Sequence, residues 1–428
     1  MAETSLEHKF TLRLVVDEEK KKVILAEACS DFVDVLLSLV TLPMGTIVRL
    51  LENHRKQEVG CLSNLYKSVV EMGTDDFETE ACKQMLLCPR SVRDVQCKRL
   101  KLNLHPTEGN KLFACRAKVV DNIEDGVFVR GRSSFIITDD LKVAVRSTDL
   151  VLRKLKSVGC GDFSKFEERL VDIGFEEVMT LLQCIFSSNA PLTDTFLNKQ
   201  SPQGVTKTCE TLSSYMERNV EESEAEPKKV ITLSAIVRKH DMRVLFVECG
   251  EDFVDLLFTF LALPLESVVE ISGDSSTFGC IGNLFKSFQA LSATQVSASK
   301  PLLPHYYRCQ KQLLNITTAQ RPPYQRTNSL VLIDPKSHGS DQPTESSGFV
   351  KRDTKFIVSD DLIITPMIST STFCILKKLQ IEAKDLEVQE ICISKTQATS
   401  LLRASLVTTS ALNAALWNMT LKNPKEEA

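Results

Sequence analysis

Apolar and polar positions alternate at the start of the chain and then change to a helical period. Phe10 to Val16 reads as a strand, Asp17 to Lys20 as a polar turn, and Lys22 to Ala28 as a returning strand. Phe32, Leu36, Leu39 and Val40 then recur at helical spacing, and Pro43 ends this run. The pattern predicts a hairpin, a buried helix, a tight corner with the proline in the first turn of a second helix, and a third helix after Gly60.

The same pattern returns in the second half of the chain. Asp31-Phe32-Val33-Asp34 recurs as Asp252-Phe253-Val254-Asp255, and Phe135 to Leu141 recurs as Phe356 to Leu362, both at an offset of 221 residues. A constant offset over such a distance indicates a tandem duplication. We expect a first repeat domain at 9–197, a polar acidic linker at 198–228, and a second repeat domain at 229–417 with a mobile loop at about 310–348.

Each repeat is expected to contain two small hairpins and several helices, which makes the fold class α+β. The second hairpin is predicted to join Val127 to Arg130 with Ser134 to Thr138, and Phe349-Val350 with Lys355 to Ser359. Closing helices are expected at 149–158 and 175–187 in the first repeat, and at 373–383 and 400–416 in the second.

Composition places the chain among ordinary globular proteins. It has 428 residues, 43% of them hydrophobic, and a net charge of −4, which offers no basic field for a nucleic acid. The residues from Met1 to Phe10 contain no apolar core, and no apolar run has the length and character of a membrane span. We therefore expect a cytoplasmic or nuclear protein whose 14 cysteines are mostly free thiols.

Two kinds of paired acids recur in both repeats. The adjacent pairs Asp139-Asp140 and Asp360-Asp361 end strands, where the two side chains point to opposite sides, so turn and capping roles are favoured over a shared cation. Asp31 and Asp34, like Asp252 and Asp255, are three apart, and we expect both members to lie on the solvated N-terminal side of a helix.

Metal binding and catalysis have weaker sequence support. Cys82, Cys88, Cys97, His105 and Cys115 could supply ligands for one zinc ion, but they lack the Cys-x-x-Cys spacing, and the second repeat offers only His305 and Cys309. No nucleophile elbow and no phosphate-binding glycine loop occurs. The sequence therefore assigns no catalytic, cofactor-binding or metal residue and implies no cofactor.

The repeated motifs resemble one family. Asp-Phe-Val-Asp before Leu-Pro, Gly60-Cys61-Leu62-Ser63-Asn64-Leu65-Tyr66-Lys67-Ser68 and the Phe-Ile-Ile-Thr-Asp-Asp-Leu strand are similar to a plant-specific family of duplicated proteins, catalogued as a domain of unknown function, number six-seven-four. The resemblance runs from about Lys9 to Leu416 and implies a plant origin and the repeated architecture, but no activity. In this family a cysteine-rich insert often follows the position of Cys115. Here Arg116 to Arg132 contains no cysteine, which disfavours a zinc site.

These observations favour a non-catalytic binding or scaffolding module with an unknown protein partner. One alternative is a hydrolase-like enzyme with a site in the cleft between the repeats, for which Cys29, Cys61 or His54 would be the candidate residues. A second alternative is a degenerate zinc-binding protein.

Overall fold

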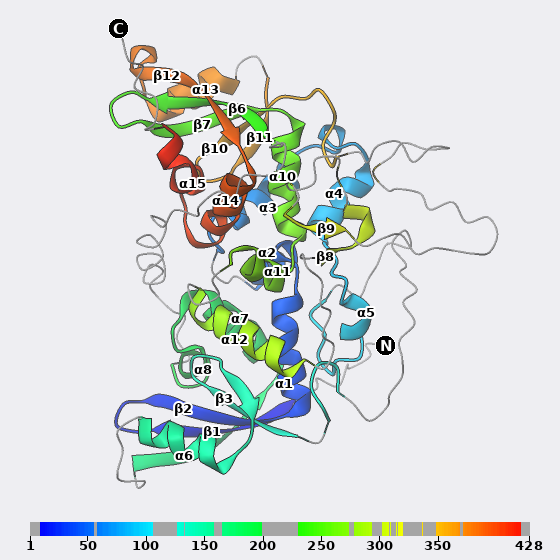
Figure 1. Ribbon diagram of the computed structural model, residues 1–428, viewed down its shortest axis with the longest axis vertical. Coiled ribbons are helices and arrows are strands. Elements are labelled where there is room, and N and C mark those ends of the chain that lie inside the picture. The colour runs from blue at the N-terminus through cyan, green and yellow to red at the C-terminus, as the bar shows by residue number, and fades with distance from the viewer. Residues whose placement is uncertain are drawn as a thin grey trace, which may run out of the picture.

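The computed structural model of the chain describes residues 9–54, 58–105, 126–131, 133–157, 165–198, 230–273, 278–292, 302–307, 309, 314, 316–319, 336, 348–368 and 371–420. The predicted linker at 198–228, apart from Asn198, and nearly all of the predicted loop at 310–348 lie outside these ranges. Figure 1 shows the described elements arranged along one long axis, with a sheet at each end and helices between the two sheets.

Each repeat builds one antiparallel five-stranded sheet with the same strand order. In the first sheet the order is β4-β3-β2-β1-β5, and the strands are β1 (Phe10–Asp17), β2 (Lys22–Cys29), β3 (Ser134–Thr138), β4 (Val143–Val145) and β5 (Phe166–Ile173). In the second the order is β11-β10-β7-β6-β12, and the strands are β6 (Ile231–Arg238), β7 (Arg243–Cys249), β10 (Phe356–Ser359), β11 (Ile364–Pro366) and β12 (Leu386–Ile393). The α+β class and the two opening hairpins are confirmed. A third, two-stranded sheet pairs β8 (Leu302–Leu303) with β9 (Thr318–Ala319).

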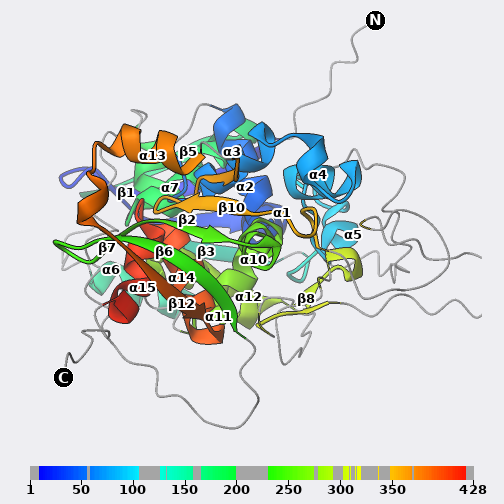
Figure 2. The same ribbon diagram turned by 90° about the horizontal axis from the view of Figure 1, so that it is seen from above.

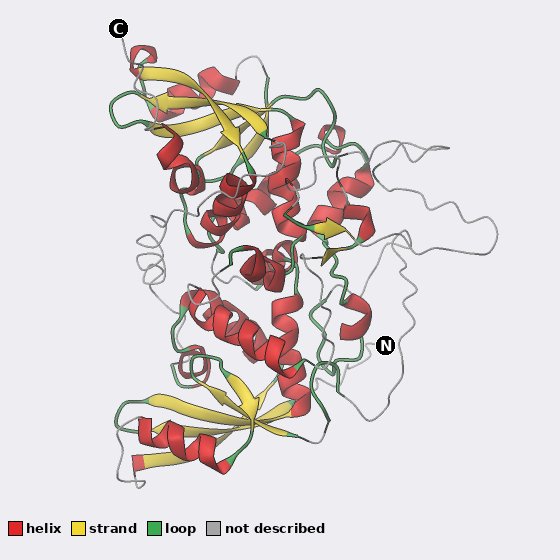
Figure 3. Ribbon diagram, in the orientation of Figure 1, coloured by secondary structure: helices red, strands yellow, loops and turns green. Residues whose placement is uncertain are grey.

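Helices fill the space between the two large sheets (Figure 3). In the first repeat they are α1 (Ser30–Ser38), α2 (Met44–Asn53), α3 (Leu62–Glu71), α4 (Glu80–Leu87), α5 (Asp94–Cys97), α6 (Thr148–Ser157), α7 (Phe175–Ser187) and α8 (Pro191–Phe196). In the second they are α10 (Glu251–Ala262), α11 (Leu265–Ile271), α12 (Gly279–Leu291), α13 (Ser371–Leu379), α14 (Lys395–Val407) and α15 (Ala411–Thr420). Helices α6 and α13 instead lie on the outer faces of their sheets (Figure 1).

The repeats exchange one helix each. Helix α3 of the first repeat lies against the second sheet, where the Ser68 hydroxyl accepts a hydrogen bond from the Ile364 amide at 2.9 Å. Helix α12 of the second repeat lies against the first sheet, where Ser287 accepts from the Val143 amide at the same distance. Because the two contacts are reciprocal, an approximate two-fold relation connects the halves, and each sheet covers a helix of the other repeat.

The two Leu-Pro corners meet at the centre of this arrangement. The Met44 amide donates to the Leu263 carbonyl at 2.8 Å, and the Leu265 amide donates to the Leu42 carbonyl at 3.0 Å, which forms an antiparallel bridge between Pro43 and Pro264. Each proline stands immediately before its helix as the N-cap, one position earlier than the first-turn placement that we expected. A proline fits there because no helical hydrogen bond needs its missing N–H.

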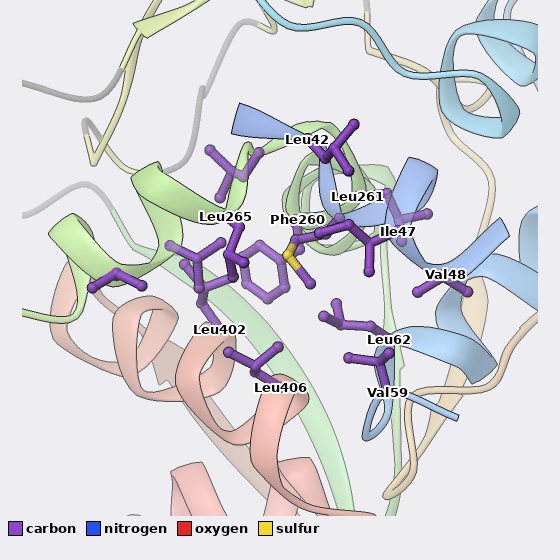
Figure 4. Packing of buried hydrophobic residues seen from close by; sticks show 14 of the residues in the cluster. Leu42, Ile47, Val48, Val59, Leu62, Phe260, Leu261, Leu265, Leu402 and Leu406 are labelled. Atoms are coloured by element: carbon purple, nitrogen blue, oxygen red, sulfur yellow. The ribbon is translucent and has the colours of Figure 1, made fainter. Parts of the chain in front are cut away.

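The apolar core continues across the boundary between the repeats. Figure 4 shows buried side chains of both repeats in one packed cluster: Leu42, Ile47, Val48, Val59 and Leu62 from the first, and Phe260, Leu261, Leu265, Leu402 and Leu406 from the second. Full burial of such a side chain stabilises a fold by roughly 1.5–3 kcal/mol. The contacts between the repeats therefore belong to one shared hydrophobic core. They are not an interface between two separately folded domains.

Two further expectations about local structure are wrong, and two strands were not expected. Strand β3 pairs with β2 and β4, and the segment 127–130 is not its partner, because the amides of that segment bind a buried carboxylate instead. The predicted helix at 400–416 is two helices, α14 and α15, separated by Thr408 to Ser410. Strands β5 and β12 were not expected, because charged residues interrupt their apolar alternation.

Candidate functional site

The Asp-Asp pairs act in turns and caps, as expected. The carboxylate of Asp139 accepts hydrogen bonds from the amide and the hydroxyl of Thr193, in the first turn of α8, at 2.9 and 2.8 Å. Asp360 accepts from the Asn413 amide, in the first turn of α15, at 2.9 Å. Asp140 instead pairs with Lys142 at 2.8 Å, so the two acids of one pair serve different partners.

The second acid of each Asp-Phe-Val-Asp motif is buried, which contradicts the expected solvated position. The Asp34 carboxylate accepts hydrogen bonds from the amides of Val127, Phe128 and Val129 at 2.6, 2.8 and 2.9 Å. Asp255 accepts from the amides of Phe349 and Val350 at 2.8 and 3.2 Å, both through Oδ1. Each acid therefore satisfies backbone donors that would otherwise be buried without partners.

Burial changes the acid–base behaviour of both carboxyls. It raises the pKa of Asp34 above the usual value, although three amide hydrogen bonds oppose the shift. Burial likewise raises the pKa of Asp255 to about 7, against the opposing hydrogen bonds from Phe349 and Val350. The glycine before each amide group allows this close approach, since a Cβ on Gly126 would lie 2.6 Å from Asp34 Oδ2, and one on Gly348 would lie 1.7 Å from Asp255 Oδ2.

These carboxyls fix the chain where each long variable loop ends. Asp34 holds 127–129 and Asp255 holds 349–350, directly after the regions in which the two repeats differ most in sequence. A bridge between Phe77 and Val350 then connects the first repeat with the second, as the Glu78 amide donates to the Phe349 carbonyl at 2.9 Å. The buried acids are thus anchors of the fold.

The five proposed zinc ligands do not converge on one point in the described part of the chain. Cys82 is buried on α4 beside Thr79, whereas Cys88 accepts a hydrogen bond from Arg49 Nη1 at 2.8 Å. Cys97 lies 3.8 Å from the Thr41 hydroxyl, and Cys115 lies outside the described residues. Within the described ranges no group of three or more His, Cys, Asp or Glu side chains could hold a metal ion.

One of these residues takes part in a buried polar cluster that has the connectivity of a catalytic triad. His105 Nδ1 lies 2.9 Å from Asp94 Oδ1, and His105 Nε2 lies 3.1 Å from the Thr41 hydroxyl. The three residues come from the turn after α1, from α5 and from the segment after α5, and all three are buried. Such a chain of hydroxyl, imidazole and carboxylate is the arrangement that activates a nucleophile.

The direction of the hydrogen bonds gives this cluster a different role. The Ser38 carbonyl, which can only accept, lies 2.7 Å from the Thr41 hydroxyl and is nearer than His105 Nε2, and a hydroxyl that donates its single proton there can only accept from the ring. With Nδ1 facing the Asp94 carboxylate, the ring therefore carries both protons. Burial lowers the pKa of His105, but hydrogen bonds to Asp94 and Cys97 outweigh that effect and raise it to about 9. A protonated ring cannot serve as the base for Thr41.

Ion pairs from both repeats surround this cluster. Arg90 Nη1 lies 3.6 Å from Asp94 Oδ2, and Arg93 Nε pairs with Glu266 of the second repeat at 2.9 Å. The Arg93 guanidinium also lies 5.0 Å from the ring centroid of Phe288 on α12. The cluster therefore attaches the segment around α5 to the centre of the molecule. Sequence reasoning missed Asp94 and Thr41, because neither stands at a recognisable spacing from His105.

The residues named for an enzyme do not assemble into a site. His54 ends α2 and faces Glu176 and the Phe175 ring, whereas Cys29 is exposed at the end of β2. The buried thiol of Cys61 donates to the Thr408 carbonyl of the other repeat at 3.0 Å, and burial raises its pKa to about 12. Cys280, its counterpart in the second repeat, donates to the Ser188 carbonyl at 3.4 Å.

In the second repeat, the two possible ligands are also separate or undescribed. Cys309 is buried and its thiol donates to the Tyr307 carbonyl at 3.6 Å, and the side chain of His305 lies outside the described residues. Tyr307 itself connects the repeats, since its hydroxyl donates to the Met85 carbonyl at 2.9 Å and accepts from the Arg90 amide at 3.1 Å.

Comparison with known proteins supports the duplication. Residues 6–122 and 116–396 each match the family model described as Protein of unknown function (DUF674). The chain matches no curated protein and no solved structure. Among the described residues, no helix is both long and apolar enough to cross a membrane.

Proposed function

The chain belongs to the DUF674 family of unknown function, and we propose that it is a non-catalytic binding or scaffolding module built from two interlocked repeats. The observation that carries this proposal is the proton arrangement at His105. In the most triad-like cluster of the described residues, the Thr41 hydroxyl lies nearer to the Ser38 carbonyl than to His105 Nε2, and the Asp94 carboxylate beside Nδ1 favours the protonated ring. A hydrolase would need the opposite arrangement, with a neutral imidazole that accepts that proton.

Differences between the two outer surfaces support a binding role. At 221-residue spacing, Arg146, Ser147 and Leu152 of the first repeat correspond to Met367, Ile368 and Phe373 of the second. Ile368 is 65% exposed and Phe373 is 68% exposed. Leu152 is also exposed, so the contrast lies at Met367 and Ile368, where the first repeat has Arg146 and Ser147. Because the two sheets have the same architecture, folding alone does not require apolar residues at these two positions, whereas contact with another protein would favour them.

An intracellular location, in the cytoplasm or the nucleus of a plant cell, and a protein partner form part of the proposal. The resemblance to a plant family supports the origin. The cysteines in the described part of the chain are all free thiols, which agrees with a reducing compartment. The degenerate zinc-binding alternative stays a prediction that metal analysis of the purified protein would test.

The catalytic alternative is tested with reactive probes on the intact folded protein. A fluorophosphonate reports activated hydroxyls and a haloacetamide reports activated thiols. We expect no rapid labelling of Thr41 or Cys97 in the native state, and labelling of Cys97 only after unfolding. Stoichiometric labelling of either residue in the native protein would overturn the non-catalytic proposal.

The binding half of the proposal needs a separate test. The full chain is used as bait in cross-linking capture beside the double variant M367R/I368S, which introduces the residues of the first repeat. A matched variant, R146M/S147I, makes the reverse change in the first repeat. We expect a partner that wild type and R146M/S147I capture and that M367R/I368S loses. Identical capture by all three proteins would contradict a role for this surface.

A further inference from the structure

Strands β5 and β12 occupy equivalent edge positions of the two sheets. Each has eight residues, and in the described part of the chain β5 pairs only with β1 and β12 pairs only with β6. Figures 1 and 2 show β12 at the margin of the second sheet, with β6 between it and β7. An edge strand carries a row of backbone donors and acceptors that a further strand can pair with.

The register identifies the residues of β12 that present these groups. The Lys239 amide donates to the Asp385 carbonyl at 2.9 Å, so this opposed pair is hydrogen-bonded. In an antiparallel ladder every second pair is bonded, which assigns Glu387, Gln389, Ile391 and Ile393 to β6. The N–H and C=O groups of Val388, Glu390 and Cys392 therefore point away from β6, toward the open edge, whereas the Leu386 amide donates to the Ala383 carbonyl.

The equivalent edge in the first repeat carries an ion pair at the position of Val388, whereas Leu170, the counterpart of Glu390, is 67% exposed. Glu168 is the counterpart of Val388, since it stands opposite Val15 as Val388 stands opposite Ile236. Glu168 pairs with Arg13 at 2.8 Å, and Arg169 pairs with Glu18 at 2.7 Å. Charged side chains along an edge are a known means of preventing further strand pairing.

The edge of β12 lacks this protection. Val388 is 69% exposed, although it is a large apolar residue. Glu387 and Glu390 are also exposed, and neither forms an ion pair with another described residue. Among the described residues, the edge thus combines backbone groups that have no strand partner with an exposed apolar side chain and two acids that have no basic partner.

We propose that β12 binds an extended segment of a partner protein, in which basic side chains flank an apolar one, as an additional strand of the second sheet. This inference rests on the proposed binding function and assigns it a location and a kind of partner. Backbone hydrogen bonds to Val388, Glu390 and Cys392 would supply affinity, as in other cases of strand addition. Contacts with Val388 and with the two acids would supply selectivity for apolar and basic residues.

The test uses the full-length chain and a phage-displayed library of linear peptides long enough to cover all eight residues of β12. Val388→Pro removes an outward-facing N–H without breaking a hydrogen bond to β6, so the sheet should tolerate it. Glu168→Pro makes the equivalent change on β5 and is the matched control. Glu390→Lys tests the charge preference. Hydrogen exchange of β6 for the β12 variants, and of β1 for Glu168→Pro, confirms that each variant keeps its sheet.

We expect enriched peptides in which basic residues flank an apolar residue, and their affinity should fall about tenfold or more in Val388→Pro and in Glu390→Lys but not in Glu168→Pro. Failure to enrich any peptide, or enriched peptides that bind Val388→Pro as tightly as wild type, would overturn the proposal. A wild-type dimer that Val388→Pro converts to a monomer would also overturn it, because a second copy would then occupy the edge. If peptides bind but their affinity depends on Met367 and Ile368 instead, the edge assignment fails while the binding function stands.

Discussion

The Asn64 side chain on α3 donates a hydrogen bond to the Asp361 carbonyl of the other repeat at 3.0 Å. Asn283 on α12 repeats this contact with the Asp140 carbonyl at 2.9 Å. Together with the thiols of Cys61 and Cys280 and the hydroxyls of Ser68 and Ser287, these amides explain the recurring Gly-Cys-x-x-Asn motif. Its polar side chains bind the backbone of the opposite repeat.

Asn64→Ala and Asn283→Ala should therefore destabilise the protein by similar amounts. Each variant leaves a partly buried carbonyl without its donor, which costs about 1 kcal/mol, and the two losses should add because the sites lie at different sheets. Urea unfolding of the single and double variants measures this. Asn53→Ala, at an exposed position on α2, is the control and should change stability by less than about 0.5 kcal/mol. Effects of Asn64→Ala no larger than this control would contradict the role assigned to the motif.

The two buried acids should respond differently to replacement by asparagine. Asp34 uses both oxygens to accept from amides, so an asparagine would direct its own N–H₂ group at a backbone donor and cost roughly 2 kcal/mol. Asp255 accepts both amides through Oδ1, which asparagine can reproduce. Chemical unfolding at pH 8 should show Asp34→Asn clearly less stable than Asp255→Asn. The reverse order would refute the hydrogen-bond assignment.

Asp255 should also make stability depend on pH in a direction unusual for an acid. Its pKa in the folded protein is about 7, whereas the unfolded value is near 3.8, so the folded state binds more protons between these values. Stability due to this group should fall as pH rises from about 4 to 7 and stay level above that. The pH profile of Asp255→Asn, measured beside wild type, should lack this decline, and an unchanged profile would argue against a titrating Asp255.

His105 should contribute stability that is lost at higher pH. Its pKa is about 9 in the folded state and 6.5 for an ordinary histidine in the unfolded chain, so the contribution is full below about pH 6.5 and disappears as pH rises through 9. His105→Gln removes the nearer of the two cations beside the Asp94 carboxylate and leaves only Arg90 at 3.6 Å, which should cost about 3 kcal/mol at pH 6. His54→Gln is the control, because its contact with Glu176 is 3.7 Å long and partly exposed. Equal stability of the two variants at pH 6 would disprove a buried imidazolium.

Thiol reactivity offers a further check on the burial of the cysteines. Cys29, Cys374 and Cys392 are exposed, whereas Cys61, Cys249 and Cys280 are buried and burial raises the pKa of each to about 12. Brief alkylation of the native protein followed by peptide mass spectrometry should modify the first three and spare the others. Rapid modification of Cys61 or Cys280 would mean that α3 or α12 does not pack against the sheet of the other repeat.

The sequence predicted the local elements better than their partners. The two opening hairpins, β1–β2 and β6–β7, and the α1, α3 and α10 helices follow from periodicity, which depends only on residues close in the chain. The exchange of α3 and α12 could not be predicted, because the apolar stripe of Leu62 and Leu65 suits either sheet equally well. Strand β5 was missed because Glu167, Glu168 and Arg169 lie on an exposed edge, where burial does not impose an apolar alternation.

The same difference between local and long-range features holds for the residues of the candidate site. The two Asp-Asp pairs were interpreted correctly, because turn preference is a local property. The prediction of a solvated Asp34 is wrong, because nothing near it in the chain reveals that Val127 to Val129, more than ninety residues away, supply its hydrogen-bond donors. The Thr41–His105–Asp94 cluster likewise joins three segments that no short motif connects.

Cleavage between the repeats tests most directly whether they form one interlocked structure. A protease site is inserted into the segment between α8 and β6, the full chain is cleaved, and the product is studied by gel filtration with light scattering and by urea unfolding. The exchange of α3 and α12 predicts that the two fragments stay together at the mass of the intact chain and unfold in a single transition. Two separate, folded fragments of half that mass would contradict the account.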